Sequence, residues 1–125
     1  MVIFVYGSNQ AGRHGRGAAL TAKLHYGAVF GKTGFSGHSY GINTKDYDVE
    51  TLPLDAINVY VSEFLDFARA NPEMQFVVTK VGCGLAGYGS HQIAPMFKQA
   101  PDNCRFDQAW MKYLPGKKFF IKTER

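Results

Sequence analysis

The sequence lacks the features that mark secreted and membrane-spanning proteins. It has only two cysteines, Cys83 and Cys104, too few for a disulfide framework, and no apolar run approaches the ~20 residues of a membrane span. Its start, Met-Val-Ile-Phe, has neither the basic region nor the cleavage site of a secretory signal. These absences predict a cytoplasmic protein that keeps both thiols reduced and makes no contact with a membrane.

Two kinds of cofactor site are also absent from the sequence. The four histidines, at positions 14, 25, 38 and 91, are scattered and meet no ligand spacing, so we expect neither a metal nor a cofactor. No Gly-Lys-Ser/Thr closes a phosphate loop of the Walker type, and residues 12–17 only approximate a dinucleotide fingerprint. Both common nucleotide motifs are therefore missing.

What is present indicates one globular domain over residues 1–125. Apolar residues make up 46% and charged residues 19% of the chain, and the formal net charge is +4. A positive charge favours anionic partners. The lysines after residue 111 predict a solvated surface more than a nucleic-acid patch, which stays open as the less favoured alternative. Arg13, Arg16, Lys32 and Lys45 lie among glycines and small polar residues, and we assign them to a binding site.

Strand-like and helix-like segments alternate along the chain. We expect strands at residues 2–6, 39–43 and 75–81, helices at 18–25 and 54–70, and a loop over 27–41. A helix capped by Ser90 should begin near residue 91, and the end should hold a strand at 103–106, a helix at 107–114 and a strand at 118–122. This order predicts an α/β fold, a three-layer α/β/α sandwich with a mixed, mostly parallel sheet.

Residues 7–17, the first glycine loop, join the first strand to the first helix. Glycines allow a backbone to approach a ligand closely, and a helix N-terminus presents free N–H groups to an anion. Arginine side chains match phosphate oxygens in pairs. We therefore predict a phosphate-binding loop whose ligand contacts are Gly7, Ser8, Asn9, Arg13, Gly15, Arg16 and Gly17.

Two side chains of this loop are candidates for chemistry. The Asn9 amide, near the end of the strand, could hold a ribose hydroxyl or a water. His14 could serve as an acid or base near neutral pH, although a solvent-exposed loop histidine is an equal alternative.

Residues 82–89, the second glycine loop, again follow a strand. With few charges, this loop would grip a ligand through backbone N–H groups. Cys83 has no basic partner nearby in sequence, so a nucleophile is disfavoured, and Tyr88 either covers a base or ribose or faces the core. The predicted ligand contacts here are Gly82, Cys83, Gly84, Leu85, Ala86, Gly87 and Tyr88.

Thr44-Lys45-Asp46 follows the second predicted strand. An adjacent cation and carboxylate at a strand end could orient or activate water, which makes Asp46 the leading general-base candidate and Lys45 a substrate contact. Turn chemistry explains an aspartate at this place equally well.

Taken together, these stretches resemble a family of small macro-domain-like proteins of phages and bacteria. The resemblance rests on Phe-Val-Tyr-Gly-Ser-Asn at 4–9, Gly-Arg-His-Gly-Arg-Gly-Ala-Ala at 12–19 and Thr-Lys-Val-Gly-Cys-Gly-Leu-Ala-Gly-Tyr at 79–88. Residues 39–46 and 93–97 look like further shared stretches, so the resemblance covers most of residues 1–100. The chain is shorter than macro domains at large, lacks their Asn-Ala-Ala-Asn run, and carries arginine and histidine inside its first loop.

The resemblance implies recognition of ADP-ribose, free or attached. Asn9 and residues 15–17 would then lie near the distal ribose, and residues 82–88 would wrap the diphosphate. Some relatives hydrolyse ADP-ribosyl bonds or phosphate esters, so an ADP-ribosyl hydrolase or phosphatase is one expectation, with Asp46, Asn9 and His14 as the catalytic candidates. A non-catalytic phage-type protein that sequesters a nucleotide signal is the alternative.

Overall fold

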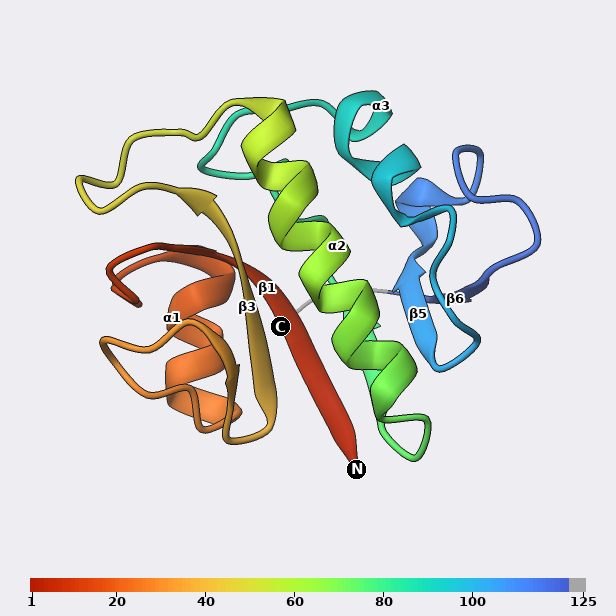
Figure 1. The fold of residues 1–125 in the computed structure, drawn as a ribbon, viewed down its shortest axis with the longest axis horizontal. Helices are drawn as coiled ribbons and strands as arrows, with labels where there is room; N and C mark the ends of the chain where they lie inside the picture. The colour runs from red at the N-terminus through yellow and green to blue at the C-terminus, as the bar shows by residue number, and fades with distance from the viewer. Residues whose placement is uncertain (122–125) are drawn as a thin grey trace.

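Residues 1–121 form one six-stranded sheet with helices on both faces (Figure 1). The structure, a computed structural model, describes residues 1–121. Its strands are β1 (Val2–Asn9), β2 (Gly34–Ser36), β3 (Ser39–Lys45), β4 (Gln75–Val78), β5 (Cys104–Asp107) and β6 (Lys118–Phe120). Its helices are α1 (Gly17–His25), α2 (Leu54–Ala70) and α3 (Ser90–Ile93), with short 3₁₀ helices η1 (Ala94–Phe97) and η2 (Gln108–Trp110).

The strands lie in the order β2-β3-β1-β4-β5-β6. Strand β1 pairs in parallel with β3 and with β4, and β4–β5 and β5–β6 are also parallel. Only β2 runs antiparallel, to β3. The predicted three-layer α/β/α sandwich with a mixed, mostly parallel sheet is confirmed.

Strand β1 occupies the middle of the sheet, as its continuous apolar pattern predicts. Because successive side chains of a strand point to opposite faces, Ile3 and Val5 join the core under α2, whereas Tyr6 packs under α1. The strand is longer than the predicted 2–6. Gly7 and Ser8 continue the parallel pairing, opposite Ile42 and Asn43 of β3. The first glycine loop therefore begins as sheet.

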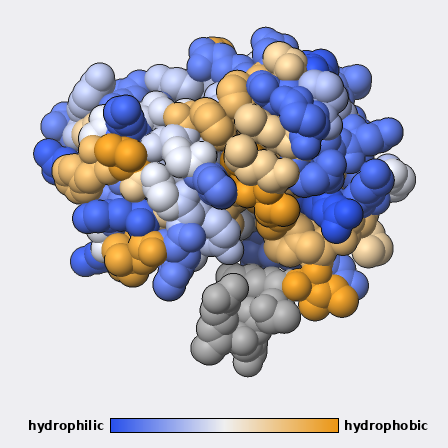
Figure 2. All heavy atoms as spheres, turned by 90° about the horizontal axis from the view of Figure 1, so that it is seen from below, coloured by the Kyte–Doolittle hydropathy of each residue, from blue (hydrophilic) through white to orange (hydrophobic). Residues whose placement is uncertain are grey.

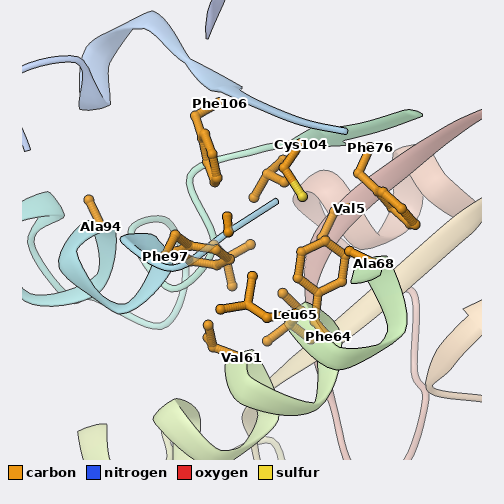
Figure 3. Packing of buried hydrophobic residues seen from close by; sticks show 14 of the residues in the cluster. Val5, Val61, Phe64, Leu65, Ala68, Phe76, Ala94, Phe97, Cys104 and Phe106 are labelled. Carbon is orange, nitrogen blue, oxygen red and sulfur yellow. The ribbon is translucent and has the colours of Figure 1, made fainter. Parts of the chain in front are cut away.

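Helix α2 supplies the main core, and the spacing of its apolar residues predicts it correctly from end to end. Figure 1 shows it crossing one face of the sheet. Its inward side chains meet aromatic residues of the sheet and of η1: the ring of Phe64 packs edge-on with those of Phe76 in β4 and Phe97 in η1, all three labelled in Figure 3. The buried residues of the helix are Ile57, Val61, Phe64, Leu65 and Ala68.

Helix α1 covers the opposite face with a much smaller core. Only Ala19 and Ala22 of the helix are buried, and with Tyr6 and Ala28 they form a separate cluster. The predicted stop after residue 25 is confirmed, because Tyr26 caps the helix and Gly27 takes a left-handed φ of 72°.

The predicted loop over residues 27–41 is wrong in part, because β2 lies inside it. Three residues with one glycine are too short to show a period in sequence, and their pairing with β3 creates the strand. Strand β3 also runs two residues past the predicted end at residue 43, and β4 ends at Val78 instead of residue 81.

The C-terminal third differs more from the predictions. Ser90 is the first residue of α3 and does not cap it, because its hydroxyl accepts a hydrogen bond from Trp110 Nε1 (3.0 Å). The predicted helix at 107–114 is only the short η2, which Asp107 caps by accepting from the Ala109 N–H. The strand predicted at 103–106 is found one residue later, as β5, and that at 118–122 is found over residues 118–120. Residue 122 lies outside the described residues.

Figure 2 shows the end of the molecule at which β1 begins. Polar side chains dominate both flanks of this end, with apolar side chains in a band between them. Among residues 1–121, no helix has the length and apolar character needed to cross a membrane.

Candidate functional site

A cleft of about 590 Å³ opens at the carboxyl ends of β1, β3 and β4. The position follows from the topology. The connection after β1 leads to α1 on one face of the sheet, and the connection after its neighbour β3 leads to α2 on the other face. Where adjacent connections diverge in this way, a crevice forms beyond the strand ends, and ligands of open α/β sheets bind there.

The cleft brings together most of the predicted ligand contacts. Twelve of the fifteen line it: Gly7, Ser8, Asn9, Arg13, Gly15, Arg16, Gly17, Lys45, Gly82, Gly84, Leu85 and Ala86. The structure places Cys83, Gly87, Tyr88, His14 and Asp46 outside its lining. Residues that the sequence analysis missed complete the walls: Ala18, Ala19, Thr44, Val49, Thr79, Lys80 and Val81.

Asn9 holds the first glycine loop in shape. Its Oδ1 accepts from the Arg13 N–H (3.0 Å) and its Nδ2 donates to the Arg13 carbonyl (2.9 Å). The side chain is buried at 6% exposure. Since an amide has two donor hydrogens and two acceptor positions, only half of this capacity remains for a ligand. Both observed hydrogen bonds of the Asn9 amide therefore stabilise the loop.

His14 is a buried side chain, so the alternative of a solvent-exposed histidine is wrong. Its ring is 1% exposed, Nε2 lies 3.0 Å from the Tyr6 hydroxyl, and the edge of Phe30 covers it. Burial, followed by the nearby Lys23 charge, lowers the pKa of His14 below its ordinary 6.5. His14 therefore anchors the first glycine loop to the core under α1 and lies away from the cleft.

This burial predicts a pH dependence of stability. The unfolded chain takes up a proton at His14 near pH 6.5, whereas the folded protein does so only at lower pH. The His14 contribution to the free energy of unfolding is thus complete above that pH and decreases below it, by up to about 1.4 kcal/mol per pH unit, until the folded-state pKa is passed. Urea unfolding between about pH 7.5 and 5 measures this slope. His14→Gln should flatten it; an unchanged slope in the variant would contradict the assignment.

The start of α1 faces the cleft without a capping side chain. Arg16 occupies the N-cap position, where no side chain bonds to the helix, and the first N–H to reach a backbone carbonyl is that of Leu20. Gly17, Ala18 and Ala19 all line the cleft. Free N–H groups at a helix start favour an anion, and Arg16 adds a positive charge beside them.

The cleft is strongly cationic. Arg13 and Arg16 enter from the first loop, Lys45 from the end of β3, and Lys80 from the segment after β4. Lys32, which the sequence analysis assigned to the site, is exposed and does not line it. No aspartate or glutamate of the described chain contributes to the lining. Four positive charges without a carboxylate predict a ligand that carries more than one negative charge.

Ser8 adds a buried polar group to the same wall. Its side chain is 3% exposed, and its hydroxyl has no hydrogen-bond partner within residues 1–121. A buried hydroxyl without a partner is costly. Ser8 is among the residues that line the cleft, but the hydroxyl oxygen itself is buried.

The second glycine loop is a series of tight turns. Gly82 takes a φ of 78°, which lets its carbonyl accept from the Tyr88 N–H (2.9 Å), and the Gly87 N–H closes on the Gly84 carbonyl (3.0 Å). Tyr88 packs on the core and donates its hydroxyl to the Leu52 carbonyl (2.6 Å). Of its two predicted roles, the structure shows the core-facing one.

Neither cysteine has the surroundings of a nucleophile. Burial raises the pKa of the Cys83 thiol, with Ser90 and Lys80 opposing it, and raises the pKa of Cys104 to about 12. Both are free thiols. Because the thiolate is the reactive form, a raised pKa makes them poor nucleophiles.

Cys83→Ser should therefore leave ligand affinity and any turnover within a factor of about two of wild type, since no bond to a ligand depends on the sulfur. Alkylation by iodoacetamide near neutral pH, followed by mass spectrometry, should be slower at Cys83 than for a free thiol in solution. Rapid labelling that also abolishes turnover would assign Cys83 a covalent role.

Asp46 organises a turn, which we call the Asp46 turn (residues 45–51). Its Oδ1 accepts from the N–H groups of Asp48 (2.9 Å) and Glu50 (3.0 Å), and its own N–H donates to the Glu50 carbonyl (2.8 Å). The turn closes with a bridge between Lys45 and Thr51. Turn chemistry thus accounts for the carboxylate: both hydrogen bonds that its Oδ1 accepts lie within the turn, and Asp46 does not line the cleft.

Within the described residues, no group of three or more histidine, cysteine, aspartate or glutamate side chains could hold a metal ion. Comparisons with family models, curated proteins and solved structures find no match to this chain.

Proposed function

We propose that the protein binds ADP-ribose or a related nucleotide diphosphate in this cleft. The observation that carries the proposal is the meeting of two glycine loops, an uncapped helix start and four cations at the carboxyl ends of three parallel strands. A volume of about 590 Å³ is in the range of small-molecule sites, roughly 300–1,000 Å³.

The arrangement suits a diphosphate in particular. Backbone N–H groups of glycine turns and of a helix start bind phosphate oxygens, and arginine side chains pair with them. Arg16 and the start of α1 contribute from one wall, and Lys80 with Gly82 contributes from the other. A ligand with two linked phosphates can engage both walls at once, which a single phosphate cannot do as well.

Binding without turnover is favoured over hydrolysis. A general base must lie within hydrogen-bond reach of the water that it activates. Among the described residues that line the cleft, none is a histidine, an aspartate or a glutamate. Asp46 follows the lining residue Lys45 but does not itself line the cleft, and its Oδ1 accepts from two N–H groups of its own turn. A protein that sequesters a nucleotide signal is therefore the stronger form of the proposal.

Calorimetry with ADP-ribose tests binding, with ADP and inorganic pyrophosphate as comparison ligands. We expect saturable binding of ADP-ribose, and no heat at millimolar concentration would end the proposal. Incubation, heat release of the ligand and chromatography then test turnover. Recovery of intact ligand means a binding protein, and recovery of ADP-ribose fragments means a hydrolase.

A further inference from the structure

Val49, in the Asp46 turn, has a backbone conformation that its side chain disfavours. Its φ is 63°, and it is the one non-glycine residue of residues 1–121 with a positive φ. For a β-branched residue this left-handed conformation costs about 1–2 kcal/mol, and it persists only where the surrounding structure imposes it.

The turn imposes it through hydrogen bonds that do not need a valine. The Val49 N–H donates to the Asp46 carbonyl (3.1 Å), and the Asp46 carboxylate holds the residues on either side. Glycine or asparagine would take this backbone conformation at lower cost. Core packing does not explain the side chain either, because Val49 is 37% exposed.

The side chain lines the cleft, together with Leu85, which is 61% exposed. Both are large apolar side chains that are exposed, whereas the other apolar lining residues are three alanines and the buried Val81. The rest of the lining consists of glycines, Asn9, hydroxyl-bearing residues and cations. One hydrogen bond links the two segments that carry them. Thr51 donates its hydroxyl to the Ala86 carbonyl (3.1 Å), which ties the Asp46 turn to the second glycine loop beside Leu85. On the other side, Leu85 Cδ1 lies 3.7 Å from where a Cβ on Gly17 would be.

We propose that Val49 and Leu85 are specificity-determining residues that contact an uncharged ring of the ligand, so that the cleft selects nucleotides over diphosphates without a base. The inference rests on the proposed function. It follows because the cations and N–H groups account for the phosphates, and an apolar surface in the same cleft gains free energy only from an apolar part of the ligand. Asp46 is then a positioning residue for Val49.

The test is Val49→Asn, which keeps about the same size, tolerates a positive φ and removes the apolar surface. We expect the affinity for ADP-ribose to fall about tenfold, as the loss of one buried aliphatic contact implies. The affinity for inorganic pyrophosphate should stay as in wild type. The urea midpoint of unfolding should stay the same or rise, because the strain is relieved.

Val59→Asn is the matched control, since Val59 is an exposed valine of α2 (56%) outside the cleft, and Leu85→Asn is the second test variant. If Val49→Asn keeps or raises the unfolding midpoint and binds ADP-ribose as wild type does, the inference is overturned while the proposed function stands. An equal loss for pyrophosphate also overturns it, because the effect would then be on the phosphate site. Failure of wild type to bind ADP-ribose overturns the proposed function, and the inference with it.

Discussion

Replacing both Arg16 and Lys80 with glutamine should lower the affinity for ADP-ribose on the order of 100-fold. Each single substitution should cost about tenfold, because a charge-assisted hydrogen bond contributes ~1.5 kcal/mol or more. The two cations lie on different walls of the cleft, at the start of α1 and after β4. Their losses should therefore add in calorimetric titrations.

A matched pair of substitutions separates this local effect from net charge. The double variant Lys98→Gln, Lys112→Gln also removes two positive charges, but from exposed positions outside the cleft. This control should change affinity by less than about twofold at moderate ionic strength, where distant charges are screened. If the control weakens binding as much as the test pair does, Arg16 and Lys80 do not contact the ligand, and affinity depends only on the net charge of the protein.

Gly12→Ala should destabilise the protein by roughly 3 kcal/mol or more, because two separate penalties meet at one residue. Gly12 has a φ of 68°, and a Cβ there would lie 2.5 Å from backbone atoms of both Gly31 and Lys32. The two nearest atoms belong to one peptide unit, which cannot move away as a flexible side chain could. Since domains of this size are stable by only ~5–15 kcal/mol, the loss would be large in urea unfolding.

Substitutions at two other glycines separate the cost of the backbone conformation from the cost of the steric clash. Gly31 has a φ of 89° with no atom near a Cβ, so Gly31→Ala should cost only about 1 kcal/mol for the backbone conformation. Gly15 has neither constraint, and Gly15→Ala should leave stability unchanged or raise it by up to about 1 kcal/mol. Equal losses at Gly12 and Gly31 would show that the close packing of residues 31 and 32 does not constrain the loop.

The sequence predicted best those elements that rest on one local pattern. Helix α2 shows apolar residues at helical spacing over 17 residues, and it is found as predicted. The cleft could be placed for a similar reason. Parallel strands followed by glycines put both loops at the same edge of the sheet, which is a consequence of chain direction and not of detailed packing.

What could not be predicted depends on contacts between distant segments. Strand β2 exists because β3 pairs with it, and nothing within its three residues indicates a strand. The burial of His14 requires Tyr6 and Phe30, and a histidine between glycines otherwise indicates an exposed loop. Lys80 was missed for a different reason: the strand predicted at 75–81 included it, whereas β4 ends at Val78 and leaves Lys80 in the cleft wall before the second glycine loop.

Val49 shows a limit of another kind. Its backbone conformation is set by hydrogen bonds of the Asp46 turn, and no propensity of valine points to it. The same carboxylate is the general-base candidate of the sequence, because a strand-end aspartate serves both turns and active sites.

The unequal cores on the two faces of the sheet have a consequence for motion. Helix α1 buries two alanines, whereas α2 buries five residues that include Phe64 and Leu65. Since local opening is least costly where few apolar contacts are lost, we expect the wall made by the first glycine loop and α1 to open at lower free energy than the face of the sheet that α2 covers.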